Sequence, residues 1–439
     1  MHLPIILSLV TTFAAFAQAG CPLTASRERQ AAVAPDLKNR ATEAKTQKRQ
    51  LPIPNFDEKT ENNCGPFSCD IFDAAKQFVD VRPGSGYEYQ DPKTGDKRGP
   101  CPGLNAAANH GFIERNGIVD IVKLAEGLNK AYAMGLDLAT VLAVVGVGLT
   151  GDPTALAWSI GGPFNPLSPL GQQPSGISYS HNSYEGDGSI TRADAYMYND
   201  PNSVNPSRFR RLIAKAENDN LTPTIMRNHS KEMNTLGRET NGYFFIGAAS
   251  GIVAPAAGQF IVNFFSNHSQ ESPNGYLNKA TLKSFFGVTG NDNNLVYKFG
   301  TERIPLNWYR RHPDRAYGVA NLAADLAIIG AKYPEVFSFG GNTGQPNTFT
   351  GVDVSDLTDG VFNAKTLFQG NNLACFLFQV QQTQIVARLD VLGLQPLLDT
   401  LKGFLSPILK PLACPQLANL NQTKFNQFPG FLQRPVGPK

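Results

Sequence analysis

The sequence predicts an all-α fold: a single large helical domain with long loops and a C-terminal tail. After Pro102, apolar residues recur at positions i, i+3, i+4 and i+7, the spacing of one helical face. The alternation of apolar and polar residues that is typical of strands is scarce. The 41 glycines and 31 prolines gather in stretches such as 161–181 and 340–352, which predicts long loops there.

The same spacing locates the individual helices. The expected helical ranges are 104–112, 118–128, 129–149, 206–218, 241–267, 280–285, 315–334 and 376–394. Residues 54–100 hold turn sequences instead, so this stretch is expected to form loops. We therefore expect one domain over residues 50–400 and a tail over residues 401–439.

Charge and cysteine content narrow the function classes. The 39 basic and 36 acidic residues give a net charge of +3, and no long basic run is present. Nucleic acid is therefore not an expected partner. Six cysteines are too few to build a fold from disulfides, so the core must supply the stability and each cysteine needs its own explanation.

The N-terminus carries processing signals. An apolar run over 3–17 ends in Ala17-Gln18-Ala19, which predicts a signal peptide over residues 1–19. The alternative is a membrane anchor, but the run is shorter than the ~20 residues that span a bilayer. A polar segment over 20–49 ends in Lys48-Arg49, which predicts a propeptide; the alternative is a flexible arm that stays attached. The chain is thus expected to be secreted and extracellular, with no membrane partner.

Removal of that propeptide would leave five cysteines, an odd number for an oxidising compartment. Cys64 and Cys69 flank a short turn that a disulfide would suit, and Cys375 and Cys414 flank a helical segment and suit a second. By elimination, Cys101 is the unpaired residue. Sequons for N-glycosylation, compatible with surface loops, lie at Asn220, Asn228, Asn267 and Asn421.

The unpaired cysteine stands in a distinctive run, Pro100-Cys101-Pro102 followed by Leu104-Asn105 and Asn109-His110-Gly111. The two prolines hold Cys101 extended at the start of a helix. The helix N-terminus favours a thiolate, which is a good axial ligand for haem iron. The alternative is a buried free cysteine at a helix start.

A second group of residues suits a small hard cation. Glu185, Gly186 and Ser189 offer a carboxylate, a backbone carbonyl and a hydroxyl within five residues, which are ligands that Mg²⁺ prefers. The alternative is a helix-capping turn in which Asp187 or Ser189 caps the following segment.

Together the two motifs resemble the haem-thiolate peroxidase family, which includes chloroperoxidases and unspecific peroxygenases. The resemblance covers roughly residues 54–270. It implies an all-helical secreted glycoprotein with haem b, in which Cys101 is the proximal iron ligand. It also implies that Glu185, the Gly186 carbonyl and Ser189 hold Mg²⁺ against a haem propionate, and that Tyr184 lines an apolar access channel together with Phe244 and Phe245. The alternative for these aromatic residues is ordinary core.

The sequence departs from the family pattern on the distal side of the haem. Peroxygenases of this type place a glutamate there, usually with an arginine two helical turns earlier. Alignment without gaps puts Ser250 and Ala257 at these positions, and neither can transfer a proton as required. The nearest substitutes are Arg238 and Glu239, so Glu239 is predicted as the acid–base group, against the alternative of a solvated residue before a helix.

The resulting prediction is a peroxidase or peroxygenase that uses hydrogen peroxide to oxidise or oxygenate small apolar or aromatic organic molecules, with halides as a further substrate class. Secretion supports peroxide as oxidant, because no membrane reductase delivers electrons outside the cell. The alternative is a secreted haem-binding or structural relative that has lost efficient peroxide activation. The substituted distal pair motivates that alternative.

Overall fold

The computed structural model describes residue 58 and residues 61–391 and 393–432. The predicted signal peptide (1–19) and propeptide (20–49) lie outside these described residues. Helices dominate the described chain, as expected from the sequence, and strands are only two or three residues long.

The helices are α3 (Ala74–Gln77), α4 (Pro102–Asn109), α5 (Ile121–Tyr132), α6 (Leu136–Thr150), α7 (Ala195–Tyr198), α8 (Pro206–Ile213), α9 (Pro223–Thr240), α10 (Ser250–Phe265), α11 (Lys279–Phe285), α12 (Val319–Lys332), α13 (Val354–Leu357), α14 (Asn372–Val391), α15 (Gln395–Leu409) and α16 (Pro429–Leu432). Short 3₁₀ turns are η1 (Ile177–Tyr179), η2 (Pro313–Arg315), η3 (Pro334–Phe337), η4 (Lys410–Leu412) and η5 (Gln422–Phe425).

Three small antiparallel sheets join the loops, a feature that the all-α expectation did not include. They comprise β1 (Ile118–Asp120) with β2 (Ala157–Ser159), β3 (Phe245–Ile246) with β6 (Gly340–Gly341) and β7 (Thr350–Gly351), and β4 (Val288–Thr289) with β5 (Val296–Tyr297). In the first sheet Val119 pairs with Trp158. Strands this short leave too little alternation in the sequence to be recognised.

Four expected helices begin later than predicted, and the two largest differences have local reasons. The expected helix 129–149 starts at Leu136, because α5 runs to Tyr132 and ends at Ala133 in the left-handed conformation (φ 54°). The expected helix 241–267 starts at Ser250, because the residues before it pair as strand β3.

Helix α9 is the longest element that the sequence reading missed. Proline stands at its first position, and the Thr222 side chain accepts a hydrogen bond from the backbone N–H of Ile225. Its buried apolar side chains are few, Met226 and Met233 among them, and they stand between many polar residues. Packing of this face against α10, rather than a strong apolar pattern, holds the helix in place.

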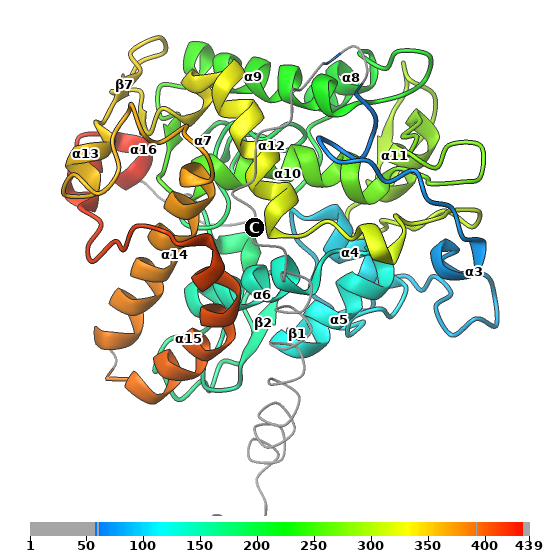
Figure 1. Ribbon diagram of the computed structural model, residues 1–439, viewed down its shortest axis with the longest axis horizontal. Coiled ribbons are helices and arrows are strands. Elements are labelled where there is room, and N and C mark those ends of the chain that lie inside the picture. The colour runs from blue at the N-terminus through cyan, green and yellow to red at the C-terminus, as the bar shows by residue number, and fades with distance from the viewer. Residues whose placement is uncertain (1–57, 59–60, 392, 433–439) are drawn as a thin grey trace, which may run out of the picture.

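The helices form two groups that meet around the centre of the molecule (Figure 1). Helices α5, α6, α14 and α15 pack on one another in the lower part of that view, and α9, α10 and α12 pack in the upper part. The contact of α12 with α14 joins the two groups. Helix α15 spans residue 401, where the tail was expected to begin, and packs against α6 and α14.

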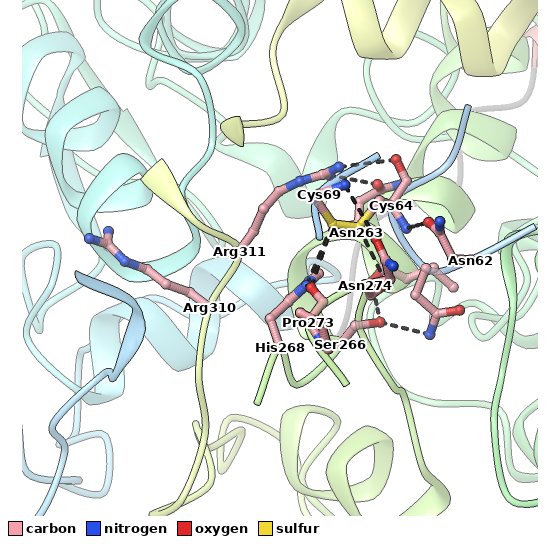
Figure 2. The surroundings of a disulfide bond; sticks show 12 residues. Asn62, Cys64, Cys69, Asn263, Ser266, His268, Pro273, Asn274, Arg310 and Arg311 are labelled. Carbon is pink, nitrogen blue, oxygen red and sulfur yellow. Dashed lines mark hydrogen bonds between the residues drawn. A yellow bond between two sulfur atoms is a disulfide. The ribbon is translucent and has the colours of Figure 1, made fainter. Parts of the chain in front are cut away.

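Disulfide pairing agrees with the sequence expectation. Cys64 is bonded to Cys69 (Figure 2), and Cys375 in α14 is bonded to Cys414 after η4. Cys101 is the free cysteine of the described chain. None of the described helices combines the length and the apolar character needed to cross a bilayer.

Candidate active site

A largely apolar cavity lies between α4, α5 and α6 on one side and α10 on the other. Its volume is about 210 Å³. Its lining residues come from these helices and from the loop that follows η1: Pro100, Cys101, Pro102, Gly103, Leu104, Leu124, Leu128, Tyr132, Met134, Leu142, Trp158, Ile177, Tyr184, Glu185, Gly186, Ser189, Ile190, Thr191, Arg192, Val253, Ala254, Ala257, Phe260, Ile261, Phe264 and Phe265. The cavity thus brings together both sequence motifs, which are some 80 residues apart in the chain.

Cys101 occupies the N-cap of α4 in an extended conformation (φ −89°, ψ 108°), with Pro102 at the first helical position, as the sequence predicted. Asn105 closes the loop before it. The amide of Asn105 accepts from the N–H of Gly99 at 3.0 Å and donates to the Gly99 carbonyl at 2.9 Å. Nε of Arg192 donates to the carbonyl of Pro100 at 2.9 Å, which ties the two motifs together.

Several groups act on the charge of the Cys101 thiol. Burial raises its pKa, whereas the backbone N–H groups of Leu104 and Gly103 and the charge of Arg192 act in the opposite direction. These N–H groups belong to the free N-terminal turn of α4, the part of a helix that stabilises negative charge. A positive ion bound at the sulfur would stabilise the thiolate further, in addition to these N–H groups.

Glu302 lies behind this loop and was not found by sequence reasoning. Its side chain is fully buried, and its Oε1 accepts from Nδ2 of Asn105 at 2.9 Å. Its backbone carbonyl accepts from Nδ2 of Asn109 at 2.9 Å, while its Oε2 has no partner. Burial raises the pKa of Glu302. Because Glu302 is 197 residues from Asn105, no local pattern could have revealed it.

The second motif forms a polar corner of the cavity. One carboxylate oxygen of Glu185, Oε2, lies 2.7 Å from Nδ1 of His181, and the other, Oε1, is buried without a partner. The hydroxyl of Ser189 accepts from the N–H of Arg192 at 3.1 Å. Nη1 and Nη2 of Arg192 are likewise buried and unpartnered. Unpaired polar groups inside a protein are costly, so this corner is built to receive polar or charged atoms.

Charged residues behind the corner keep it in place. Burial opposes the charged form of His181, but the carboxylates of Glu185 and Asp187 outweigh it and raise its pKa to about 9. Asp187 accepts from the N–H of Ala195 and from the N–H of Phe245, each at 3.1 Å. Asp187 therefore acts as a structural anchor between the cavity wall, α7 and β3.

The α10 side of the cavity presents only apolar side chains among its lining residues, including Val253, Ala254 and Ala257. Ser250 does not line the cavity; its side chain lies against Gly186, where an added Cβ would come within 2.8 Å of it. The positions at which peroxygenases carry a distal arginine and glutamate therefore offer no acid–base group in this chain.

Arg238 and Glu239 do not reach the cavity. Nη2 of Arg238 donates to the carbonyl of Glu335 at 2.7 Å, and its guanidinium lies 3.6 Å from the ring centre of Phe349. Glu239 is exposed in the last turn of α9. Arg238 contacts η3, Glu239 is exposed and neither lines the cavity, so their positions give no support to a distal acid–base role.

The aromatic residues divide between the cavity and the core. Tyr184 lines the cavity, with its ring centre 5.6 Å from that of Trp158. Phe244 and Phe245 do not line it, contrary to expectation. Phe245 packs among the aromatic rings of the C-terminal segment, including Phe425 at 5.1 Å, so it belongs to ordinary core.

A free cysteine at a helix start, on the wall of an apolar cavity that also has a polar corner, is in a helical fold the arrangement expected of a haem-thiolate peroxidase. Comparison with known proteins agrees. The family described as "Peroxidase, family 2" matches residues 87–313, and the chain belongs to this haem-thiolate peroxidase family. The protein is accordingly a peroxide-using oxidoreductase, and its family suggests a haem cofactor.

Named relatives extend the match over most of the chain. The dothistromin biosynthesis peroxidase of Dothistroma septosporum is 37% identical over 373 residues, which are 82% of this chain and 88% of the relative. The aromatic peroxidase of Fusarium equiseti is 39% identical over 369 residues, 80% of this chain and 83% of the relative. The aromatic peroxygenase of Cyclocybe aegerita is 30% identical over 129 residues, 29% of this chain and 34% of the relative.

Proposed function

We propose that this protein is a secreted peroxidase or peroxygenase that uses hydrogen peroxide to oxidise or oxygenate small apolar or aromatic molecules, with halides as a further substrate. In this proposal haem b is held by Cys101, and Mg²⁺ by Glu185, Gly186 and Ser189. The observation that carries it is the free thiol of Cys101 at the wall of an apolar cavity, at the N-terminus of α4.

The residues of the cavity fit a haem group. A haem has a broad apolar ring, an iron that takes an axial ligand and two carboxylates. The apolar side chains of α5, α6 and α10 suit the ring, Cys101 suits the iron, and the unpartnered Nη1 and Nη2 of Arg192 suit a carboxylate. When bound, haem supplies the iron centre at which peroxide reacts and the substrate is oxidised.

The polar corner suits a cation. Oε1 of Glu185 is buried without a partner, and Gly186 and Ser189 line the same corner. Oxygen ligands of this kind suit Mg²⁺. His181, on the other oxygen of Glu185, fixes the orientation of the carboxylate.

The substrate class follows from the cavity wall and the names of the relatives. The α10 side offers only apolar side chains, so it excludes water and favours apolar or aromatic molecules. The names of two relatives, aromatic peroxidase and aromatic peroxygenase, support the same class.

The cavity also favours the alternative function, a haem-binding relative with inefficient peroxide activation. Cleavage of peroxide needs a group that moves a proton between its two oxygens, and such groups contribute ~10²–10⁴-fold to rates. Ala257 stands on the cavity wall of α10, where it cannot do this. The two functions therefore differ in the rate of peroxide-dependent turnover by the wild-type protein.

Ligation by Cys101 is tested by the reduced carbon monoxide complex. Thiolate-ligated haem should absorb near ~450 nm in this state, and the Cys101→Ser variant should lose the band. Absence of the band in the wild-type protein would refute both the ligand and the enzyme proposal. Metal content is measured on the same preparations: Glu185→Gln should lose Mg²⁺, whereas Glu126→Gln, an exposed carboxylate on α5, should keep it.

The choice between the two functions is tested by restoring a carboxylate. If proton transfer limits turnover, Ala257→Glu should raise peroxide-dependent oxidation by ~10²-fold or more, and the Ala257→Gln control should not. Fast turnover by the wild-type protein, with no gain in Ala257→Glu, would reject the alternative function.

Secretion is tested with the natural host. The protein should be recovered from the medium with Gln50 as its first residue, and glycosidase treatment should lower its mass. Recovery inside the cell with an intact N-terminus would refute this part of the proposal.

A further inference from the structure

An exposed aromatic cluster lies on the short helix α7, only a few residues after the motif that lines the cavity. Tyr196 is 46% exposed, Met197 44% and Tyr198 60%. Three consecutive large side chains open to solvent on a four-residue helix are unusual for a surface that only has to stay soluble. They form a surface that dissolved molecules can reach.

Tyr196 is paired with a second tyrosine. Its ring stacks on that of Tyr243, with ring centres 3.7 Å apart and planes 13° from parallel. The interaction of its side chain with that of Tyr243 raises the pKa of Tyr196. Tyr243 is itself partly exposed. Both rings are therefore in contact with each other and open to solvent, which can take up the proton that a phenol loses with an electron.

The tyrosine pair is connected to the cavity wall through one buried carboxylate. Asp187 follows Gly186, which lines the cavity. Its Oδ1 accepts from the N–H of Ala195, the residue before Tyr196, at 3.1 Å. Its Oδ2 accepts from the N–H of Phe245, two residues after Tyr243, at 3.1 Å. The path along these bonds is on the order of 15 Å long, so each tyrosine backbone lies no farther than that from the wall of the cavity.

We propose that Tyr196 and Tyr243 form a second, surface oxidation site for phenols that are too large to enter the cavity. The proposal rests on the proposed function, because peroxide is the oxidant that removes the first electron. It adds a substrate class that a cavity of about 210 Å³ is too small to admit: phenolic groups carried on polymers or other large molecules.

The electron balance is simple. In the holoenzyme, Tyr196 would lose one electron to the oxidising equivalent that peroxide supplies and one proton to water, and would become a neutral phenoxyl radical. A phenolic group of the large substrate then transfers one electron and one proton to Tyr196, which restores the tyrosine and leaves the radical on the substrate. Two such cycles provide the two electrons that reduce one peroxide molecule to water.

The experiment compares a phenol attached to a large dextran with the same phenol free in solution, with hydrogen peroxide and the holoenzyme. Wild-type protein should oxidise both. The double variant Tyr196→Phe/Tyr243→Phe, which keeps both rings, should lose at least tenfold in rate on the dextran-bound phenol and keep its rate on the free phenol. Tyr198→Phe, a more exposed tyrosine on the same helix, is the matched control and should behave as wild type.

A second measurement does not depend on turnover. Holoenzyme treated with peroxide and a nitroso spin trap should carry the trap on the peptide with Tyr196 or on the peptide with Tyr243, as located by mass spectrometry. Labelling of Tyr198 alone would overturn the proposal. So would equal rates of the wild type and the double variant on the dextran-bound phenol, or no oxidation of it by the wild type. Failure to oxidise even the free phenol would instead refute the proposed function.

Discussion

Lowering the pH from 7 to 5 should reduce the free energy of unfolding by about 2 kcal/mol through His268 alone. The His268 side chain is fully buried beside the disulfide of Cys64 and Cys69 (Figure 2). Its Nδ1 lies 2.9 Å from the carbonyl of Pro273 and 3.7 Å from Sγ of Cys69. Burial, together with the charge of Arg311, lowers its pKa to about 3.

The sign and size of the effect follow from this pKa. In the unfolded chain a histidine has a pKa near ~6.5. Below that pH the unfolded chain binds a proton that folded His268 does not, so stability falls as the pH falls from about 6.5 toward 3. The difference in bound protons between the unfolded and the folded chain, integrated from pH 7 to pH 5, is roughly 1.4. Each unit of this integral lowers the free energy of unfolding by ~1.36 kcal/mol.

The assay is urea unfolding of the disulfide-bonded holoenzyme at pH 7 and pH 5. His268→Gln, which cannot titrate, should lose about 2 kcal/mol less than wild type between these pH values. Asn274→Ala is the control: its side chain accepts from the N–H of Cys69, so its loss should lower stability equally at both pH values. The reasoning is refuted if the free energy of unfolding changes between pH 7 and pH 5 by the same amount, within ~0.5 kcal/mol, in the wild type and in His268→Gln.

Three further predictions concern packing, cross-linking and a buried charge. Gly146→Ala should lower stability by about 1–3 kcal/mol in thermal unfolding, because its Cβ would stand 2.6 Å from the ring of Trp158, which lines the cavity; an unchanged melting temperature would contradict this contact. The double variant Cys375→Ala/Cys414→Ala should lose about 4 kcal/mol, the cost of freeing a closed loop with a sequence separation of 39, and urea unfolding in which this variant matches the wild type would show that the bridge adds nothing. Glu302→Gln should raise the melting temperature more at pH 7.5 than at pH 4.5, because burial raises the pKa of this carboxyl and folding therefore becomes less favourable as it ionises; an equal shift at both pH values would rule that out.

The sequence alone determined the features that depend on near neighbours. Prolines on both sides of Cys101 fix it at the start of α4, and the close spacing of Glu185, Gly186 and Ser189 brings them to one corner. Cys64 and Cys69 are the two ends of a six-residue segment, so they are close enough in the chain to pair. Caps, turns and short bridges need only the local chain, so a motif read from the sequence keeps its meaning in the fold.

The tertiary structure decided everything that depends on how distant segments meet. Glu302 reaches Asn105 across 197 residues, and Tyr196 stacks on Tyr243 from another segment. Glu239 was the nearest carboxylate in the sequence, yet it is exposed at the end of α9. The rotation of a helix about its axis is set by packing against its neighbours, which no local pattern records. The sequence therefore identified the iron-ligand candidate, whereas only the fold showed that the α10 side of the cavity is lined by apolar side chains.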